Sequence, residues 1–188
     1  MCAICELKIE FNISHPLALS VAVATRTAID AGTLPESLMD GALSNVKMRM
    51  AAIDALKGLT ARLEASKSAS ELQALPDFYV LLIEIGTWGF FHATETGFDP
   101  DVTPQPPNVT SDDQAERDVV FVTSETALRA VLEGRMSIDA AFAGDLMMLD
   151  ANADHTAQLR AVLNDALPDW LPGSLPGSLP SPSYASSC

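Results

Sequence analysis

Residues 118–167 constrain the fold most, because strand and helix patterns alternate there and each pattern ends at a residue that can stop it. Apolar side chains recur with a period of two in the strand segments and at three- and four-residue spacing in the helical ones. The predicted elements are a strand at 118–123, two short helices at 125–133 and 138–143, a strand at 146–149 and a closing helix that ends before Pro168. This order predicts a fold of mixed α and β structure.

Serine and glycine residues mark the predicted helix ends. Ser124 and Ser137 stand where a side-chain oxygen can accept hydrogen bonds from the unpaired amides of a first helical turn. Gly134 can adopt the left-handed conformation that ends a helix, and Gly144 stops the next one. The closing helix carries one apolar face and ends before Pro168, which cannot continue the hydrogen-bond ladder.

The same residues resemble the C-terminal half of the sterol-carrier-protein family. The matching positions are Val120, Val122, Ser124, Leu132, Gly134, Arg135, Ala141, Phe142 and Gly144, together with the strand and amphipathic helix that follow. Members of that family are small domains that enclose an apolar tunnel for sterols, fatty acids or acyl chains. The resemblance, which extends loosely back to Phe78, therefore implies an α+β fold in which helices cover a small mixed sheet and a tunnel binds an apolar ligand for transfer.

Apolar side chains of the second half are the candidate lining of such a tunnel. They are Phe90, Phe91, Val120, Val122, Leu128, Leu132, Phe142, Met147, Leu149, Leu159 and Leu163. Methionine suits an adaptable cavity, because its unbranched thioether can repack around varied ligands. The alternative is that these residues form only a core, in which case the protein is an accessory or structural interaction module with a filled tunnel. Neither role calls for a cofactor.

Charge and length limit the possible partners. A chain of 188 residues suffices for one domain with an extension, and a hydrophobic share of 48% excludes a wholly disordered chain. The net charge of −14 repels phosphate backbones, so nucleic acid is not an expected partner. The most apolar window, residues 78–93, is interrupted by Glu84 and two glycines and is shorter than the roughly 20 residues of a membrane span. With no secretory signal pattern, we expect a soluble, cytoplasmic protein.

The first 75 residues are predicted to form a strand followed by a helical extension. Alternation of apolar and polar residues predicts a strand at 7–13, and a helix capped by Ser14 is predicted to run to Gly32. A longer helix is predicted over 36–66. Its apolar stripe consists of Met39, Leu43, Val46, Met50 and Ile53. The stripe continues along a line shifted around the helix axis, formed by Leu56, Leu59 and Leu63. Such a stripe is either core or a seam for a partner helix, so the extension either packs on the sheet or forms an interface with a second copy or another protein.

Residues 76–168 are predicted to form the sterol-carrier-like domain. A strand covered on both faces is expected at 78–85, with a hairpin partner at 90–94. Residues 94–117 are acidic and rich in proline without periodicity, which indicates a long loop that is either a mobile lid or a disordered insertion. Residues 169–188 repeat the motif Leu-Pro-Gly-Ser and are predicted to be a flexible tail.

Cys2 and Cys5 form the motif closest to enzyme chemistry. In thioredoxin-type proteins such a pair opens a helix after a strand, whereas here it precedes a predicted strand. A zinc site would require two further ligands, and the remaining candidates lack paired spacing. A cysteine-dependent activity, through the pair or through Cys2 as an N-terminal nucleophile, is the alternative to a non-enzymatic protein. His15 and His92 lack a recognisable nucleophile and orienting partner in the sequence, so both are predicted to be structural.

Overall fold

The computed structural model describes residues 14–36 and 43–167, which form an α+β fold with a mixed sheet, as predicted. The predicted strand at 7–13, both cysteines of the N-terminal pair and the tail from residue 169 lie outside the described residues. The helices are α1 (Ala18–Asp30), α2 (Ser44–Ser66), α3 (Ala69–Gln73), α4 (Glu125–Leu132), α5 (Ile138–Ala143) and α6 (Ala153–Ala166). The strands are β1 (Phe78–Leu82), β2 (Thr87–Phe91), β3 (Ala93–Thr94), β4 (Gly97–Phe98), β5 (Val119–Thr123) and β6 (Met147–Asp150). A short 3-10 helix, η2, spans Gln114–Glu116.

The main sheet has the strand order β2-β1-β5-β6. β1 runs antiparallel to β2, with Phe78 opposite Phe91, and parallel to β5, with Phe78 opposite Val119. β5 runs antiparallel to β6, which places Phe121 opposite Leu149. Every residue of β1 and β5 is buried, which agrees with the prediction that the first strand is covered on both faces.

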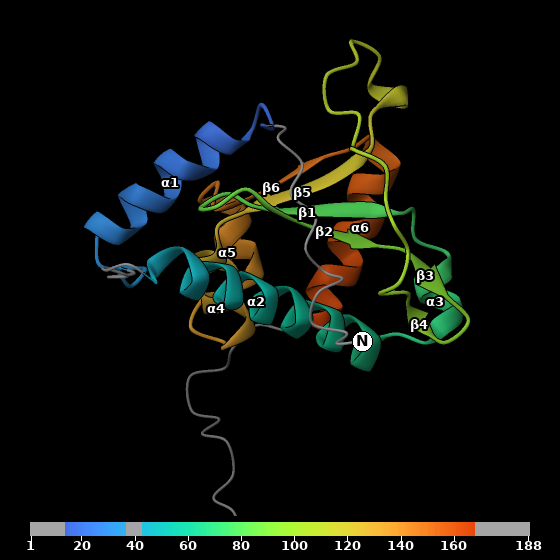
Figure 1. Cartoon of the computed structure of the whole chain (residues 1–188), viewed down its shortest axis with the longest axis horizontal. Coiled ribbons are helices and arrows are strands. Elements are labelled where there is room, and N and C mark those ends of the chain that lie inside the picture. Colours follow the sequence, from blue (N-terminus) through green and yellow to red (C-terminus); the bar gives the residue numbers. More distant parts are fainter. Residues whose placement is uncertain (1–13, 37–42, 168–188) are drawn as a thin grey trace, which may run out of the picture.

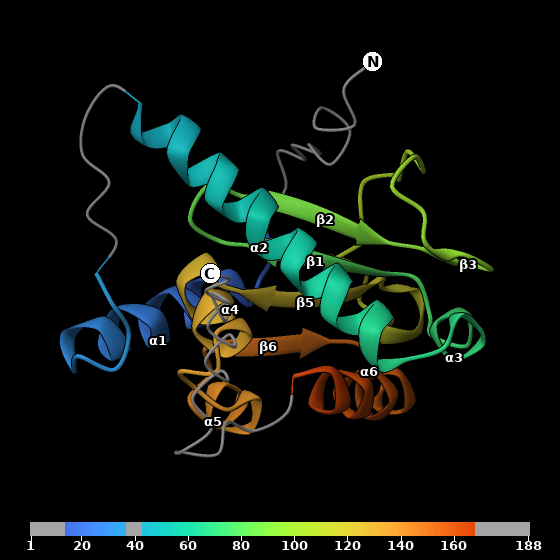
Figure 2. The same ribbon diagram turned by 90° about the horizontal axis from the view of Figure 1, so that it is seen from below.

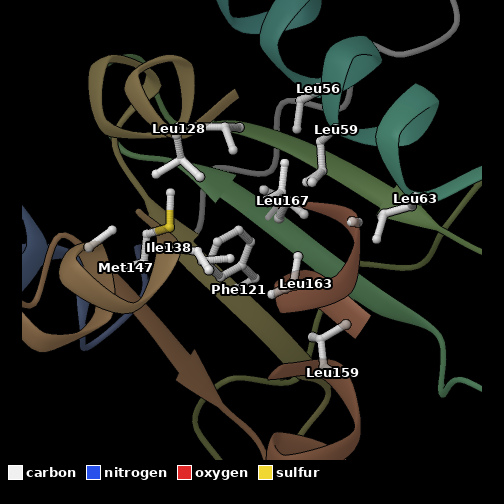
Figure 3. Packing of buried hydrophobic residues seen from close by; sticks show 14 of the residues in the cluster. Leu56, Leu59, Leu63, Phe121, Leu128, Ile138, Met147, Leu159, Leu163 and Leu167 are labelled. Atoms are coloured by element: carbon white, nitrogen blue, oxygen red, sulfur yellow. The ribbon is translucent and has the colours of Figure 1, made fainter. Parts of the chain in front are cut away.

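Helices cover the two faces of this sheet unequally. α2, α4, α5 and α6 lie on one face, and α1 lies on the other (Figure 1 and Figure 2). The first face carries the larger core, in which α2, α4 and α6 point leucine side chains towards Phe121 (Figure 3). The second face carries a smaller cluster consisting of Val21, Tyr79, Leu81, Trp88, Val109, Val120 and Val122. α1 and α2 of the N-terminal extension therefore cover opposite faces of the sheet.

The two N-terminal helices differ from their predictions at their starts. α1 begins at Ala18, because Leu17 occupies the N-cap position and donates its amide to Nδ1 of His15 at 3.1 Å; Ser14 is not the cap. α2 begins at Ser44, and residues 37–42 of the longer predicted helix lie outside the described residues.

The apolar stripe of α2 is divided between core and surface. The buried residues of α2 are Ala52, Ala55, Leu56, Leu59 and Leu63, which include the predicted shifted line. Leu43, Val46 and Met50 are exposed, so of the two interpretations of the stripe these three residues do not fit the core. The helix meets the sheet only from its third turn onwards, because its first two turns extend past the edge of the core (Figure 2).

The unit from β5 to α6 follows the sequence pattern closely. Oγ of Ser124 and Oγ of Ser137 each accept an amide hydrogen bond in the first turn of α4 and α5, at 3.0 and 3.1 Å. Gly134 has a φ of 69° and ends the first of these helices, as predicted. β6 begins and ends one residue later than expected, and Asn152 caps α6.

The hairpin and the long loop differ more from their predicted bounds. β2 spans residues 87–91 instead of 90–94, because the turn forms at Gly86 and Gly89 lies inside the strand. β3 and β4 then form a second, two-stranded sheet. The predicted loop at 94–117 therefore contains β4 and η2, and it contacts the second face of the sheet. The hydroxyl of Tyr79 donates to the carbonyl oxygen of Gln105 at 2.8 Å, and Val109 is buried.

Candidate ligand-binding cavity

A partly open cavity of about 290 Å³ lies between α2 and β2, at the edge of the main sheet. Its lining comes from one side of α2, the middle of β2 and the segment from β4 onwards. The lining residues are Leu56, Lys57, Thr60, Ala61, Glu64, Gly89, Phe90, Phe91, Phe98, Asp99 and Pro100. Most of the lining surface is apolar. In the described part of the chain β2 has no partner on its outer side, so the cavity opens along an edge strand.

Gly89 brings α2 close to β2 at the floor of the cavity. A Cβ atom at this position would lie 3.0 and 3.2 Å from the two terminal carbons of Leu56 and 3.3 Å from Cε2 of Phe91. These separations are shorter than ordinary contacts, so the strand accepts the leucine only because residue 89 has no side chain. The glycine therefore sets the distance between the helix and the strand.

Aromatic packing fixes the wall opposite α2. The rings of Phe78 and Phe91 stack with centroids 4.7 Å apart, and Phe98 meets Phe91 edge-on at 5.2 Å. Offset and edge-on arrangements are the favoured geometries of aromatic pairs. Phe91 and Phe98, two of the three phenylalanines of the lining, are thus held by Phe78 of the core, which gives the cavity a rigid apolar side.

Glu64 ties the small β3-β4 hairpin to α2. Its Oε1 accepts the amide hydrogen of Phe98 at 2.9 Å, and this bond uses one oxygen of a carboxylate in the cavity wall. Asp99, also in the wall, accepts the amide hydrogen of Asp101 at 2.9 Å. Lys57 is the single cation among the lining residues, and it lies on the exposed side of α2. The polar groups therefore lie at the rim, around an apolar interior.

Glu84 lines a second, smaller cavity beside the first turn of α4. This cavity measures about 150 Å³ and is lined by Met48, Ala51, Ala52, Glu84, Ile85, Glu125 and Thr126. The carboxylate of Glu84 accepts the amide hydrogens of Glu125 and Thr126 at 2.9 and 3.3 Å. Burial raises the pKa of Glu84, although these amides favour its charged form. Because both oxygens are bonded to the helix backbone, we assign Glu84 a structural role in fixing the start of α4.

The predicted tunnel residues are distributed over both faces of the sheet. Phe90, Val120 and Val122 belong to the cluster under α1, which the sheet separates from the others. The larger core, which is covered by α2, α4 and α6, contains Leu128, Met147, Leu159 and Leu163 (Figure 3). Leu149 packs against this core. Of the predicted set, the 290 Å³ cavity brings together Phe90 and Phe91.

Phe142 and Leu132 lie apart from the cavity lining. The half-buried ring of Phe142 packs 6.1 Å from the ring of Phe121, and the guanidinium of Arg160 lies 4.4 Å above it. Leu132, at the end of α4, packs against α2, where its Cδ1 would lie 3.2 Å from a Cβ on Gly58. Both residues therefore contribute to contacts between helices.

Sequence reasoning missed the α2 side of the cavity. Leu56 was recognised as apolar, but Thr60, Ala61 and Glu64 were not recognised as lining. The available signal was a glycine inside an apolar strand segment, since an isolated glycine there often marks a close approach by another part of the chain.

His15 lies buried between α1 and the end of β6. Its Nε2 is 3.2 Å from Oδ2 of Asp150, while Nδ1 accepts the amide hydrogen of Leu17. Arg117 approaches the other oxygen of Asp150 at 3.5 Å. Burial lowers the pKa of His15 below its ordinary value, against the opposing effect of Asp150. The imidazole therefore anchors α1 to the sheet in its neutral form.

Other candidate chemistry gains no geometric support in the described ranges. Nδ1 of His92 lies 2.9 Å from Oδ1 of the Asp77 carboxylate at the surface. Residues 14–36 and 43–167 contain no cluster of three histidine, cysteine or acidic side chains that could hold a metal ion. Cys2 and Cys5, the weak metal candidates, lie outside these ranges.

None of the described helices is both long enough and apolar enough to cross a membrane. The chain matches no protein-family model, and searches of curated proteins and of solved structures found no match.

Proposed function

We propose that the protein binds a small apolar ligand, such as a fatty acid or acyl chain, in the cavity between α2 and β2. The observation that carries this proposal is the cavity itself, which combines an apolar interior with a polar rim. Binding sites for small molecules are typically concave and mostly apolar, with a few polar groups that orient the ligand. The activity is binding and transfer, without bond-breaking chemistry.

The size of the cavity favours a slender ligand. Its volume of about 290 Å³ is just below the roughly 300–1,000 Å³ that is usual for small-molecule sites. A single acyl chain suits this space better than a bulky sterol. Each buried methylene contributes roughly 0.8 kcal/mol, so a chain of several methylenes needs no strong polar anchor.

Sequence resemblance gives this proposal secondary support. Residues 118–167 resemble a family that carries apolar ligands, but the cavity is formed by residues 56–64 and 89–100, which lie outside that stretch. The proposal consequently differs from the predicted tunnel in its location while keeping the class of ligand.

Two tryptophan variants on α2 test the site with a fluorescent fatty-acid analogue. Ala61 is exposed and lines the cavity, so Ala61→Trp should fill the opening and weaken probe binding at least tenfold. Ala65 is also exposed, one turn further along α2, and does not line the cavity, so Ala65→Trp is the matched control. Equal affinity of both variants for the probe would exclude this cavity as the binding site.

A further inference from the structure

The charged side chains that line the cavity between α2 and β2 lie at two separate ends of it. Lys57 directly follows Leu56, whose terminal carbons lie next to Gly89 in the middle of β2. Glu64 lies about 10 Å further along the axis of α2, since each residue of a helix adds about 1.5 Å, and its carboxylate binds the amide of Phe98 in β4. The cavity therefore has a lysine end beside β2 and an acidic end beside β4.

Two carboxylates make up the acidic end. Glu64 and Asp99 each accept one backbone amide hydrogen bond, at 2.9 Å in both cases, through Oε1 and Oδ1. Such bonds stabilise the charged form of a carboxylate and do not neutralise it. An anionic group of a ligand would therefore be repelled at the acidic end, whereas hydrocarbon can still pack there against Phe91 and Phe98.

Lys57 carries the positive charge at the lysine end, and it forms no ion pair with any described residue. The chain has 11 basic and 25 acidic residues, so carboxylates outnumber the cations that could pair with them. The described lysines and arginines that do have a carboxylate partner are Arg26, Lys67, Arg117, Arg129, Arg135 and Arg160. The hydrocarbon stem of a lysine can lie along apolar surface while its ammonium group stays in water. Lys57 can therefore bind an anionic head group at the rim without blocking the apolar interior.

We propose that the cavity binds an anionic amphiphile in one orientation, with its carboxylate beside Lys57 and its hydrocarbon chain directed along β2 towards Phe98. This inference rests on the proposed binding function, and it adds the class of head group and the direction of the ligand. The reverse orientation would place the carboxylate against Glu64 and Asp99. Because Lys57 is exposed, its contact with the head group is hydrated, so the lysine selects the orientation while the apolar interior supplies most of the affinity.

Isothermal titration calorimetry of the full chain with decanoate, decan-1-ol and decylammonium tests the class of head group. We expect decanoate to bind most tightly and decylammonium most weakly. Lys57→Glu should weaken decanoate binding about fivefold, strengthen decylammonium binding and leave decan-1-ol within about twofold, because it replaces attraction by repulsion at an exposed site. Lys47→Glu makes the same change in net charge at an exposed lysine of α2 that does not line the cavity, and should leave all three affinities unchanged.

Decanedioate tests the direction of the chain, because it adds a second carboxylate at the far end of decanoate. That carboxylate would meet the acidic end, so Asp99→Asn should strengthen decanedioate binding about threefold and leave decanoate within about twofold. Asparagine keeps an oxygen that can accept the amide hydrogen of Asp101, and Asp101→Asn, outside the cavity, is the control. If decan-1-ol binds but Lys57→Glu leaves decanoate unchanged, or Asp99→Asn leaves decanedioate unchanged, the proposed orientation is overturned and the cavity remains a binding site. Failure of decanoate, decan-1-ol and decylammonium to bind would overturn the proposed function as well.

Discussion

Oε1 of Glu64 lies 2.5 Å from the position that a Cβ atom on Gly97 would occupy. Gly97 also has a φ of 122°, a backbone conformation that side-chain-bearing residues rarely adopt. The hydrogen bond from the amide of Phe98 to Glu64 therefore depends on glycine at position 97 for two separate reasons. Through this bond the small hairpin closes one side of the cavity.

Replacing Gly97 by alanine should lower the free energy of unfolding by about 2–3 kcal/mol, as the sum of backbone strain and displacement of the carboxylate. Gly86→Ala is the control, because Gly86 has a φ of 62° with no atom within 4 Å of a Cβ, and strain alone should cost about 1–2 kcal/mol. Urea unfolding measures both. Equal losses would show that the contact with Glu64 contributes nothing.

Substitution at the cavity floor should also be destabilising. In Gly89→Val the new side chain overlaps Leu56, which is 1% exposed and has little room to move. Overpacking of this kind costs about 1–3 kcal/mol, and it should narrow the cavity and weaken probe binding as well. Unfolding and probe titration check the two effects. A variant as stable as the original protein, with unchanged affinity, would contradict the close approach of α2 and β2.

His15 should make stability depend on pH in the acid range. Because its pKa in the folded protein is below the ordinary 6.5, the stability it contributes is present above that value and is lost as the pH falls through the lowered pKa. The contribution of Glu84 has the opposite dependence on pH. Because the pKa of Glu84 is raised above the ordinary 4.5, its contribution to the free energy of unfolding is present at a pH below 4.5 and is lost as the pH rises through the raised pKa. Comparison with a His15 variant isolates the histidine.

In His15→Asn the amide oxygen can still accept from Leu17, so the loss of melting temperature between about pH 8 and about pH 5 should be smaller than in the original protein. An unchanged pH profile in His15→Asn would rule out the buried imidazole as its source.

Phe142→Trp distinguishes the cavity from the predicted tunnel. A tunnel lined by Phe142 would be narrowed by this change, whereas the structure places the ring between Phe121 and Arg160, away from α2. Probe affinity should therefore stay within about twofold of the original, while stability falls by about 1 kcal/mol from overpacking. A tenfold loss of affinity in the folded variant would return the site to the sequence-predicted location.

Local signals made the second half of the chain predictable. Ser124 and Ser137 cap helices by bonds to nearby amides, so the boundaries of α4 and α5 depend on residues within one helical turn. The continuous apolar run beginning at Phe78 likewise identified a strand with two buried faces. In these segments local chemistry and tertiary packing favour the same structure.

Tertiary contacts determine the features that the sequence could not predict, namely which residues of α2 are buried, which face of the sheet a residue occupies and where the cavity lies. Val46 and Leu56 look alike in an apolar stripe, and only the point where α2 meets the sheet exposes one and buries the other. The two faces of a sheet are not distinguishable from alternation alone, so Val120 and Leu128 were assigned to one tunnel although they lie on opposite faces. The cavity arises from a helix and a strand about thirty residues apart, and its clearest local trace is Gly89.

Native mass spectrometry of the purified full chain, followed by organic extraction, tests the central claim most directly. We predict a mass above that of the bare chain, an apolar ligand in the extract, and uptake of an added fatty acid that Ala61→Trp abolishes and Ala65→Trp retains. A bare mass in a protein that also refuses added fatty acids would contradict a ligand-binding function and favour an interaction module.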